Sequence, residues 1–445
     1  MTASPYRIRG VIEGFYGHPW THEQRLGLID FLAPRGLNVF AFSPKDDPSL
    51  RRHWRVPADA LSQGRLAELV RRSRASGVEL LWCISPGLSI RYSDADDVAV
   101  LLARVREATA SGVTRIGLLL DDIPRELQHH EDRAAYDDLA AAHVALANRV
   151  RADLPDGVGL IVCPTDYWGT GTEPYLAALG LGLDPRIDLF WTGRAICSAT
   201  LDLADAATFA RTTKRPPTFW DNYPVNDVAM SYELHIGPYR GRDPHLWLAA
   251  GGIVANAMEL FEASKIPLAT IADYLRDPAG YESEASWQRA MRDVVGEADL
   301  ESFSLFADNV RSSCLAADDA PIVGAALESA LFHLDGDDEG AVATELDAIA
   351  SRLAPAAAHW LHGRVANQAL RDEIRPWLEA FELGAQAIRR MADLAAAGRL
   401  ASDGPTELRP YQVGLRRARV RVFGDALEMT LSVLTGTTFR PGEVP

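Results

Sequence analysis

Cysteine is scarce in this sequence of 445 residues, and its spacing excludes the common metal centres. The four cysteines are Cys83, Cys163, Cys197 and Cys314. No CxxC pair and no Cys/His spacing typical of a zinc site is present. Three of the four lie in or beside apolar stretches, where a free thiol behaves as a small buried hydrophobe. The sequence therefore predicts neither a metal nor a disulfide framework.

Long apolar runs and basic clusters are missing as well. No uninterrupted apolar run reaches the ~20 residues that a membrane span requires, and the first residues lack the apolar centre of a signal peptide. The formal net charge is −16, without the basic stretch that would bind nucleic acid or anionic lipid. These absences predict a cytoplasmic protein with neither nucleic acid nor a membrane as partner, although export without a leader stays open.

Eight short apolar segments, most of them separated by helical patterns, occupy the first part of the chain. They are Tyr6–Ile12, Leu37–Phe42, Val78–Ile84, Ile116–Leu120, Val158–Cys163, Ile187–Trp191, Pro217–Trp220 and Gly251–Val254. A (β/α)8 TIM barrel typically takes about 250 residues. A doubly wound α/β sheet would need a ligand fingerprint at its switch point, and neither GxGxxG nor a P-loop is present. We therefore predict a catalytic (β/α)8 barrel over residues 6–281.

The pattern changes at about Glu282, where strand-like runs end and helical spacing begins. Ala343–Leu353 illustrates this spacing, and the prolines at 321, 355, 376 and 405 suggest helix boundaries. We predict an all-α helical domain over residues 282–445, with the last seven residues as a frayed tail.

Two adjacent carboxylates, Asp121 and Asp122, follow one of the apolar segments directly. The segment has the composition of a central parallel strand, buried on both faces. The carboxyl ends of barrel strands form the catalytic face of a TIM barrel. A single Asp in this position would more often cap the next helix. The pair, together with the other strand ends, favours catalysis.

The ends of the predicted strands collect the residue types that bind sugars. They are Glu13, Gly14, Lys45, Asp46, Asp47, Asp121, Asp122, Asp166, Tyr167, Trp191, Trp220, Asp221, Asn222, Asp227 and Asn256. Aromatic faces pack on the CH groups of a pyranose, and amides and carboxylates bond its hydroxyls. Each residue alone has an ordinary explanation, as a core aromatic, a turn residue or a solvated charge. Their convergence on one face of the barrel favours a sugar site.

Because Asp121 and Asp122 are neighbours in sequence, they fit only some of the known glycosidase mechanisms. In most glycosidases two carboxylates flank the scissile bond, about 5–5.5 Å apart in retaining enzymes. Neighbours in sequence leave one strand end side by side, so they do not obviously bracket a bond. A mechanism without a protein nucleophile fits better: one carboxyl protonates the leaving oxygen, and the other orients a substrate group, such as a 2-acetamido group, that attacks the anomeric carbon.

Several blocks of residues carry a family resemblance over roughly Arg9–Pro267. They are Gly10–Trp20, Ser43–Asp47, Ile84–Leu88, Leu120–Ile123, Cys163–Tyr167, Trp220–Pro224 and Asn226–Asp227. Together they resemble the catalytic domain of glycoside hydrolase family 84, which comprises the O-GlcNAcases and bacterial β-N-acetylglucosaminidases. Asp166 stands where the animal enzymes have Glu, and Trp168 where they have Cys. These differences put the preference for the leaving group in doubt rather than the chemistry.

The resemblance implies a retaining exo-β-N-acetylglucosaminidase that forms an oxazoline intermediate and needs no cofactor or metal. It makes Asp122 the general acid and base, Asp121 the residue that polarises the acetamide nitrogen, and Tyr167 an assistant near the acetamide. The implied substrate-binding residues are Gly14, Lys45, Trp220, Asn222, Asp227 and Asn256. The implied partner is a glycoside or glycoprotein bearing β-linked GlcNAc, and the helical domain could pair two copies into a homodimer.

Two other functions compete with this reading. A catalytically silent GlcNAc-binding or regulatory protein would retain the pocket without turnover, but the intact Asp121-Asp122 pair argues against it. A Schiff-base lyase or aldolase would use Lys45, because TIM barrels host such enzymes as well.

Overall fold

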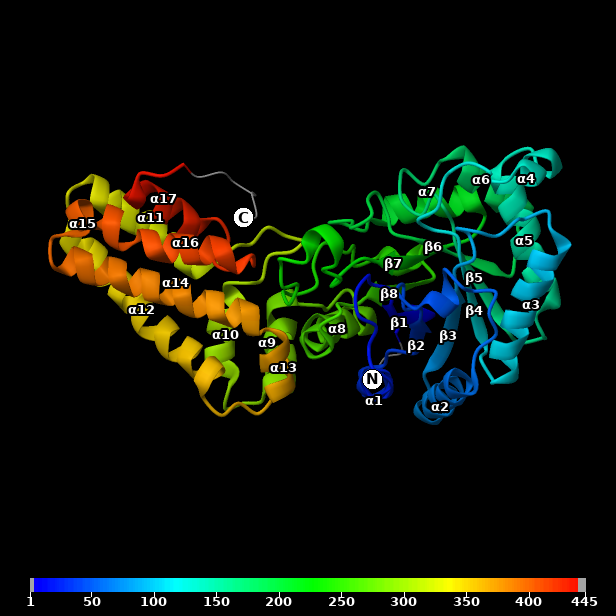
Figure 1. Cartoon of the computed structure of the whole chain (residues 1–445), viewed down its shortest axis with the longest axis horizontal. Coiled ribbons are helices and arrows are strands. Elements are labelled where there is room, and N and C mark those ends of the chain that lie inside the picture. The colour runs from blue at the N-terminus through cyan, green and yellow to red at the C-terminus, as the bar shows by residue number, and fades with distance from the viewer. Residues whose placement is uncertain (1–3, 439–445) are drawn as a thin grey trace. The chain divides into compact units, whose positions relative to one another are not determined.

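The computed structural model describes residues 4–438, which pack into two compact units (Figure 1). The first, the barrel unit, comprises the chain up to Val225 together with Arg240–Glu259 and Ile271–Tyr281. The second, the helical unit, comprises Asn226–Tyr239, Leu260–Thr270 and the chain from Glu282 on. Two segments that precede residue 282 are thus grouped with the helical unit.

Within the described residues, eight parallel strands close into a barrel in sequence order. They are β1 Ile8–Glu13, β2 Val39–Phe42, β3 Glu79–Ile84, β4 Arg115–Leu119, β5 Gly159–Cys163, β6 Ile187–Trp191, β7 Pro217–Asp221 and β8 Gly252–Asn256. Strand β8 closes the barrel by pairing with β1, with Ile8 opposite Gly252. The predicted (β/α)8 fold is confirmed, and each predicted strand end lies within about two residues of the observed one, the usual uncertainty of such boundaries.

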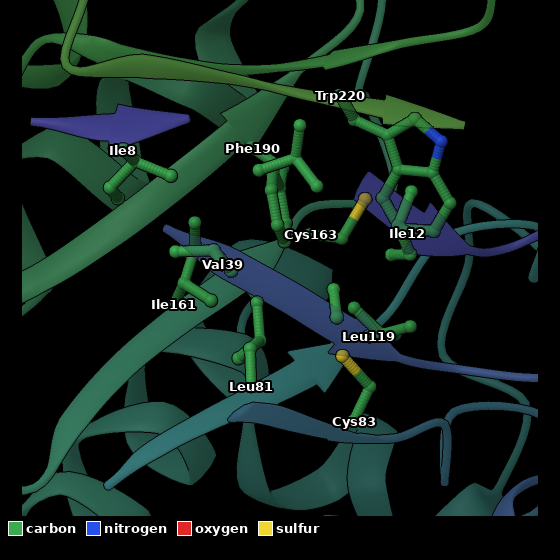
Figure 2. Close-up of a cluster of buried hydrophobic side chains, with 12 residues drawn as sticks. Ile8, Ile12, Val39, Leu81, Cys83, Leu119, Ile161, Cys163, Phe190 and Trp220 are labelled. Carbon is green, nitrogen blue, oxygen red and sulfur yellow. The ribbon is translucent and has the colours of Figure 1, made fainter. Parts of the chain in front are cut away.

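The interior of the barrel is filled by side chains from all eight strands, so it is a core and not a pore. Figure 2 shows this cluster, in which Ile8, Leu81 and Phe190 come from different strands and point into one region. Gly252 makes the closure possible, because a Cβ there would lie 2.2 Å from the carbonyl oxygen of Ile8. Trp220 belongs to this core cluster and lies at the end of β7 that carries the site.

Helices follow the strands around the barrel (Figure 1). They are α1 His22–Leu32, α2 Ala60–Ser76, α3 Ala95–Ala110, α4 His130–Ala135, α5 Leu139–Asp153, α6 Pro174–Gly182 and α7 Leu203–Thr213, with the short 3-10 helices η1 Ala33–Arg35, η2 Pro48–Leu50 and η4 Leu246–Leu248. Helix α8 Phe261–Arg276 is divided between the two units, and η3 Val228–Met230 belongs to the helical unit. Thr21 and Gln24 form a capping box at the start of α1. The Ala-rich sequence of residues 134–153 predicts one continuous helix. That prediction is wrong, because Asp138 leaves the helical conformation and caps α5 through the backbone N–H of Ala141.

The helical unit has a core of its own. Its helices are α9 Ser283–Val295, α10 Leu300–Asp308, α11 Pro321–Asp335, α12 Glu339–His362, α13 Gln368–Glu373, α14 Arg375–Ala396, α15 Leu400–Glu407, α16 Arg409–Ala418 and α17 Ala426–Thr435. Trp360 of α12 is fully buried, and its ring lies 4.9 Å from that of Phe303. Pro321 and Pro376 occupy first helical turns, where a proline costs no hydrogen bond.

Two other prolines do not mark helix boundaries as predicted. Pro355 lies inside α12, and Pro405 lies inside α15. The pattern around Pro355 is helical on both sides, and burial of Leu353 and Trp360 on the same helix outweighs the lost backbone bond. The predicted tail over residues 439–445 lies outside the described residues. No helix between residues 4 and 438 is long and apolar enough to cross a membrane.

Candidate active site

The end of β4 and the loop after β2 bring Lys45 and Asp121 into a buried ion pair. The ammonium of Lys45 donates to Oδ2 of Asp121, and both residues are almost inaccessible to solvent. The other carboxylate oxygen, Oδ1, is also buried and has no hydrogen-bond partner among the described residues. A buried carboxylate oxygen without a donor is costly. This oxygen is therefore a ready acceptor for a donor on a bound molecule.

Electrostatics keeps Lys45 charged. Burial disfavours the ammonium, but the negative charge of Asp121 and the groups around it outweigh burial and raise the pKa of Lys45 above its usual range. A Schiff-base lysine must lose its proton to act as a nucleophile. The lyase interpretation, which requires a neutral Lys45, is therefore unfavourable.

Asp122 lies beside this pair in a different environment. Its carboxylate is about one third exposed and accepts two phenolic hydrogen bonds, from Tyr16 at 2.7 Å and from Tyr167 at 2.9 Å. The ammonium of Lys45 lies 3.9 Å from Oδ2. The backbone of Asp122 is left-handed, with φ of 52°, a conformation that Asp tolerates better than most residues. Both oxygens of this carboxylate are oriented by hydroxyl groups.

The pKa of Asp122 is lowered from its usual value by its neighbours. Burial favours the protonated form, but the positive charge of Lys45 opposes it. The hydroxyls of Tyr16 and Tyr167 also stabilise the carboxylate. Without substrate, Asp122 is therefore ionised at neutral pH. A role as general acid requires substrate to add burial or to replace these bonds, which would restore the proton.

Tyr16 and Arg51 are members of the site that the sequence alone did not identify. The guanidinium of Arg51 donates to the Tyr16 hydroxyl at 2.9 Å and lies 5.3 Å from the ring centroid. Burial and the nearby carboxylate raise the pKa of Tyr16 to about 12, so its hydroxyl remains a donor. Tyr16 lies in the Gly-Phe-Tyr-Gly segment after β1, whose two glycines indicate a sharp turn more directly than a site residue. No sequence pattern marked Arg51.

A cluster of amides lies at the ends of β1, β7 and β8. Asn256 accepts a bond from the backbone N–H of Gly14 at 3.1 Å and donates to Oδ1 of Asn222 at 2.9 Å. The indole N–H of Trp220 donates to that same Oδ1 at 2.9 Å. A Cβ on Gly14 would lie 2.5 Å from the Trp220 ring. The predicted residues Gly14, Trp220, Asn222 and Asn256 are therefore brought together, and Lys45 lies 5.3 Å from the Trp220 ring centroid.

Several residues at the strand ends serve the fold instead of a sugar site. Glu13 is completely buried and forms a two-point ion pair with Arg25, at 2.7 Å for each bond. Trp191 is fully buried and stacks on Phe209 with ring centroids 4.9 Å apart. Asp47 caps η2 through the backbone N–H of Ser49. Their interpretation as sugar ligands does not fit these contacts.

Asp227 belongs to the helical unit, where it precedes η3 as its N-cap residue. Its contact with sugar hydroxyls stays a prediction. Within residues 4–438, no group of three or more His, Cys, Asp or Glu side chains is arranged to hold a metal ion.

Comparisons with known proteins agree with this geometry. The family model for beta-N-acetylglucosaminidase matches residues 9–308. The Protein O-GlcNAcases of Rattus norvegicus and Mus musculus are each 32% identical over 273 residues, which is 60% of this chain but 30% of those proteins. The chain thus spans less than a third of the length of these curated relatives.

Solved structures extend the similarity over nearly the whole chain. An aspartate-to-asparagine mutant of the O-GlcNAc hydrolase of Thermobaculum terrenum superposes with a TM-score of 0.90 at 32% identity, covering 97% of this chain and 95% of that one. CpGH84B gives a TM-score of 0.86 at 26% identity, with 97% and 77% covered. The resemblance seen in the sequence is confirmed: the chain belongs to glycoside hydrolase family 84, the family of the β-N-acetylglucosaminidases.

Proposed function

We propose that this protein removes terminal β-linked GlcNAc by substrate-assisted catalysis, with retention of configuration. One observation carries the proposal: Asp121 offers a buried, unpartnered oxygen while its other oxygen is bonded to Lys45. An acceptor of this kind suits the N–H of a 2-acetamido group. A carboxylate held by an ammonium accepts a hydrogen bond more readily than it donates a proton, so Asp121 is not the acid.

In the first step, Asp121 accepts the acetamide N–H and increases the electron density on the acetamide oxygen. That oxygen attacks the anomeric carbon, and the bond between this carbon and the leaving oxygen breaks. Asp122 transfers its proton to the leaving oxygen. The product is an oxazolinium ion paired with the Asp121 carboxylate, or a neutral oxazoline if Asp121 takes the nitrogen proton.

In the second step, Asp122 is the base. It accepts a proton from water, and the oxygen of that water attacks the anomeric carbon while the acetamide oxygen leaves. Two inversions at one carbon give overall retention. Tyr16 and Tyr167 support this reversal of role, because both their hydroxyls bond the ionised form of Asp122.

Trp220 and the amide cluster would bind the sugar around this centre. The half-buried Tyr167 packs against the core cluster and bonds Asp122, which suits an assistant near the acetamide. The names of the relatives favour a glycoprotein bearing O-GlcNAc over cell-wall or chitin fragments. A cytoplasmic location remains a prediction. A homodimer formed through the helical unit also remains a prediction, which light scattering would test.

The decisive test compares three fluorogenic aryl glycosides with the purified protein. We expect cleavage of the β-N-acetylglucosaminide and little cleavage of the matching β-glucoside, which lacks the acetamide nucleophile. A β-N-acetylgalactosaminide reports selectivity at the 4-hydroxyl. Cleavage of the β-glucoside at a similar rate would contradict the role of the acetamide. Binding of GlcNAc without any cleavage would favour the silent binding protein instead.

A further inference from the structure

Trp168 is a large aromatic residue that remains exposed in the loop after β5. Its exposed fraction is 38%. It follows Tyr167, whose hydroxyl bonds Asp122 at 2.9 Å. Large exposed apolar side chains that gather at a functional site often mark binding surfaces. Because it follows Tyr167, Trp168 lies on the side of the site where the leaving group would depart from Asp122.

The backbone on both sides of Trp168 is fixed to the loop after β6. The N–H of Thr192 donates to the carbonyl of Tyr167 at 2.8 Å, and the N–H of Gly169 donates to the carbonyl of Gly193 at 2.9 Å. Two backbone bonds that flank one residue restrict its position. The indole is thus presented by a held segment of chain rather than by a free loop.

The same loop carries a second exposed apolar residue, Ile196, with an exposed fraction of 48%. Its carbonyl accepts a bond from the side-chain N–H of Asn222 at 2.8 Å. Asn222 in turn belongs to the amide cluster of the site. One exposed residue is therefore joined to the acid side of the site through Tyr167, and the other to the amide side through Asn222.

The leaving group must lie against Asp122, because that residue protonates the leaving oxygen in the proposed function on which this inference rests. We propose that Trp168 and Ile196, the leaving-group rim, bind apolar side chains of a polypeptide next to its GlcNAc-bearing Ser or Thr. An aliphatic Ile offers a sugar neither a stacking face nor a hydrogen bond, which favours a peptide over a second sugar. Two charged residues close in sequence to Asp122 and Tyr167, Arg125 and Asp166, pair with each other at 3.2 Å.

The experiment compares two glycosylated substrates that share the same bond. One is a capped serine bearing β-GlcNAc, and the other is a peptide with valines on both sides of that serine. Trp168→Ala should lower kcat/KM for the valine peptide about tenfold, the loss typical of a buried aromatic contact, and leave the single serine unchanged. Ile196→Ala should show the same selectivity with a smaller loss.

Trp247 provides a matched control. It is 39% exposed in η4, which precedes β8 and so lies at the opposite end of the barrel from the site. Trp247→Ala should leave kcat/KM unchanged for both substrates. Because these side chains are exposed, the thermal midpoints of the three variants should match that of the natural protein.

Three results would overturn the inference. Equal losses of Trp168→Ala on both substrates would mean that the residue supports catalysis generally. A loss on chitobiose without a loss on the valine peptide would mean that the rim takes a sugar. If the natural protein releases GlcNAc from neither glycosylated serine nor aryl glycoside, the proposed function fails, and the rim loses its basis with it.

Discussion

Two buried ion pairs follow strands at the same end of the barrel, and they differ in how much of the carboxylate is used. After β7, Arg242 donates to both oxygens of Asp221, at 2.6 and 3.0 Å. After β4, Lys45 bonds only one oxygen of Asp121, and the other has no partner among the described residues. Both acids are nearly inaccessible to solvent.

The difference separates a pair that serves the fold from the pair to which we assign a function. A carboxylate that is bonded at both oxygens by a planar guanidinium has a fixed orientation and little capacity for a ligand. A carboxylate with one oxygen free bears a desolvation cost that substrate can relieve. The state of the second oxygen therefore tells more about function than burial or charge does, since these are similar in the two pairs.

The largest effect is expected from Asp121→Asn. The amide keeps the size of the side chain but lacks the charge that polarises the acetamide. We expect kcat/KM to fall about 10³-fold, the scale of losing a key electrostatic group. The loss should be similar for aryl and alkyl β-N-acetylglucosaminides, because nucleophile formation precedes departure of either group. If the variant cleaves the aryl substrate at the rate of the natural protein, Asp121 takes no part in the mechanism.

Asp122→Ala should instead lower kcat/KM much more for the alkyl substrate than for the aryl substrate. An alkyl leaving group needs a proton, so its kcat/KM should fall about 10²–10⁴-fold, the usual range for general acid catalysis. An activated aryl group leaves without protonation and should retain much of its rate. Steady-state kinetics on the two substrates measures this ratio. Equal losses would show that Asp122 is not the acid.

Asp221→Asn tests the structural member of the comparison. Breaking a buried ion pair by removing one partner costs about 3–5 kcal/mol of unfolding free energy. Urea denaturation should detect this loss, and the folded fraction should retain nearly unchanged kcat/KM. A large fall in kcat/KM in fully folded protein would mean that Asp221 also takes part in function. The contrast between the two ion pairs would then be wrong.

Tyr16→Phe should have the smallest effect and should appear in the pH profile. The Tyr16 hydroxyl stabilises the ionised form of Asp122, so its removal raises the pKa of that residue. An acid with a higher pKa keeps its proton to higher pH. The alkaline limb of the kcat/KM profile should therefore move to higher pH. If the alkaline limb stays at the same pH or moves to lower pH, Asp122 is not the titrating acid.

Much of the barrel could be predicted because its strands are buried on both faces and therefore form apolar runs, as in Ile116–Leu120. Asp121 and Asp122 stand out because charge follows such a run directly. The break before α5 could not be predicted with equal ease, since the Ala-rich sequence continues across Asp138. Asp138 is a good N-cap residue, but such a residue can also lie inside a helix, so its presence alone does not show that a new helix begins there.

The remaining parts of the site depend on contacts between loops that are distant in sequence. Arg51 influences Asp122 by its charge and through the hydroxyl of Tyr16, and no local pattern describes such a chain of bonds. The contrast between Asp121 and Asp221 is likewise invisible in sequence, because Lys45 and Arg242 meet these acids from other loops. The sequence indicated the strand ends at which these residues gather, but not which carboxylate oxygen remains without a partner.

The left-handed backbone of Asp122 has a consequence for transplanting this chemistry to another barrel. In an extended strand, successive side chains point to opposite faces, so a second acid placed after the first would turn toward the helix layer. The change of backbone at Asp122 is what allows both neighbours to reach Lys45. A graft that copies the two acids without this turn would deliver one of them to the wrong side of the strand.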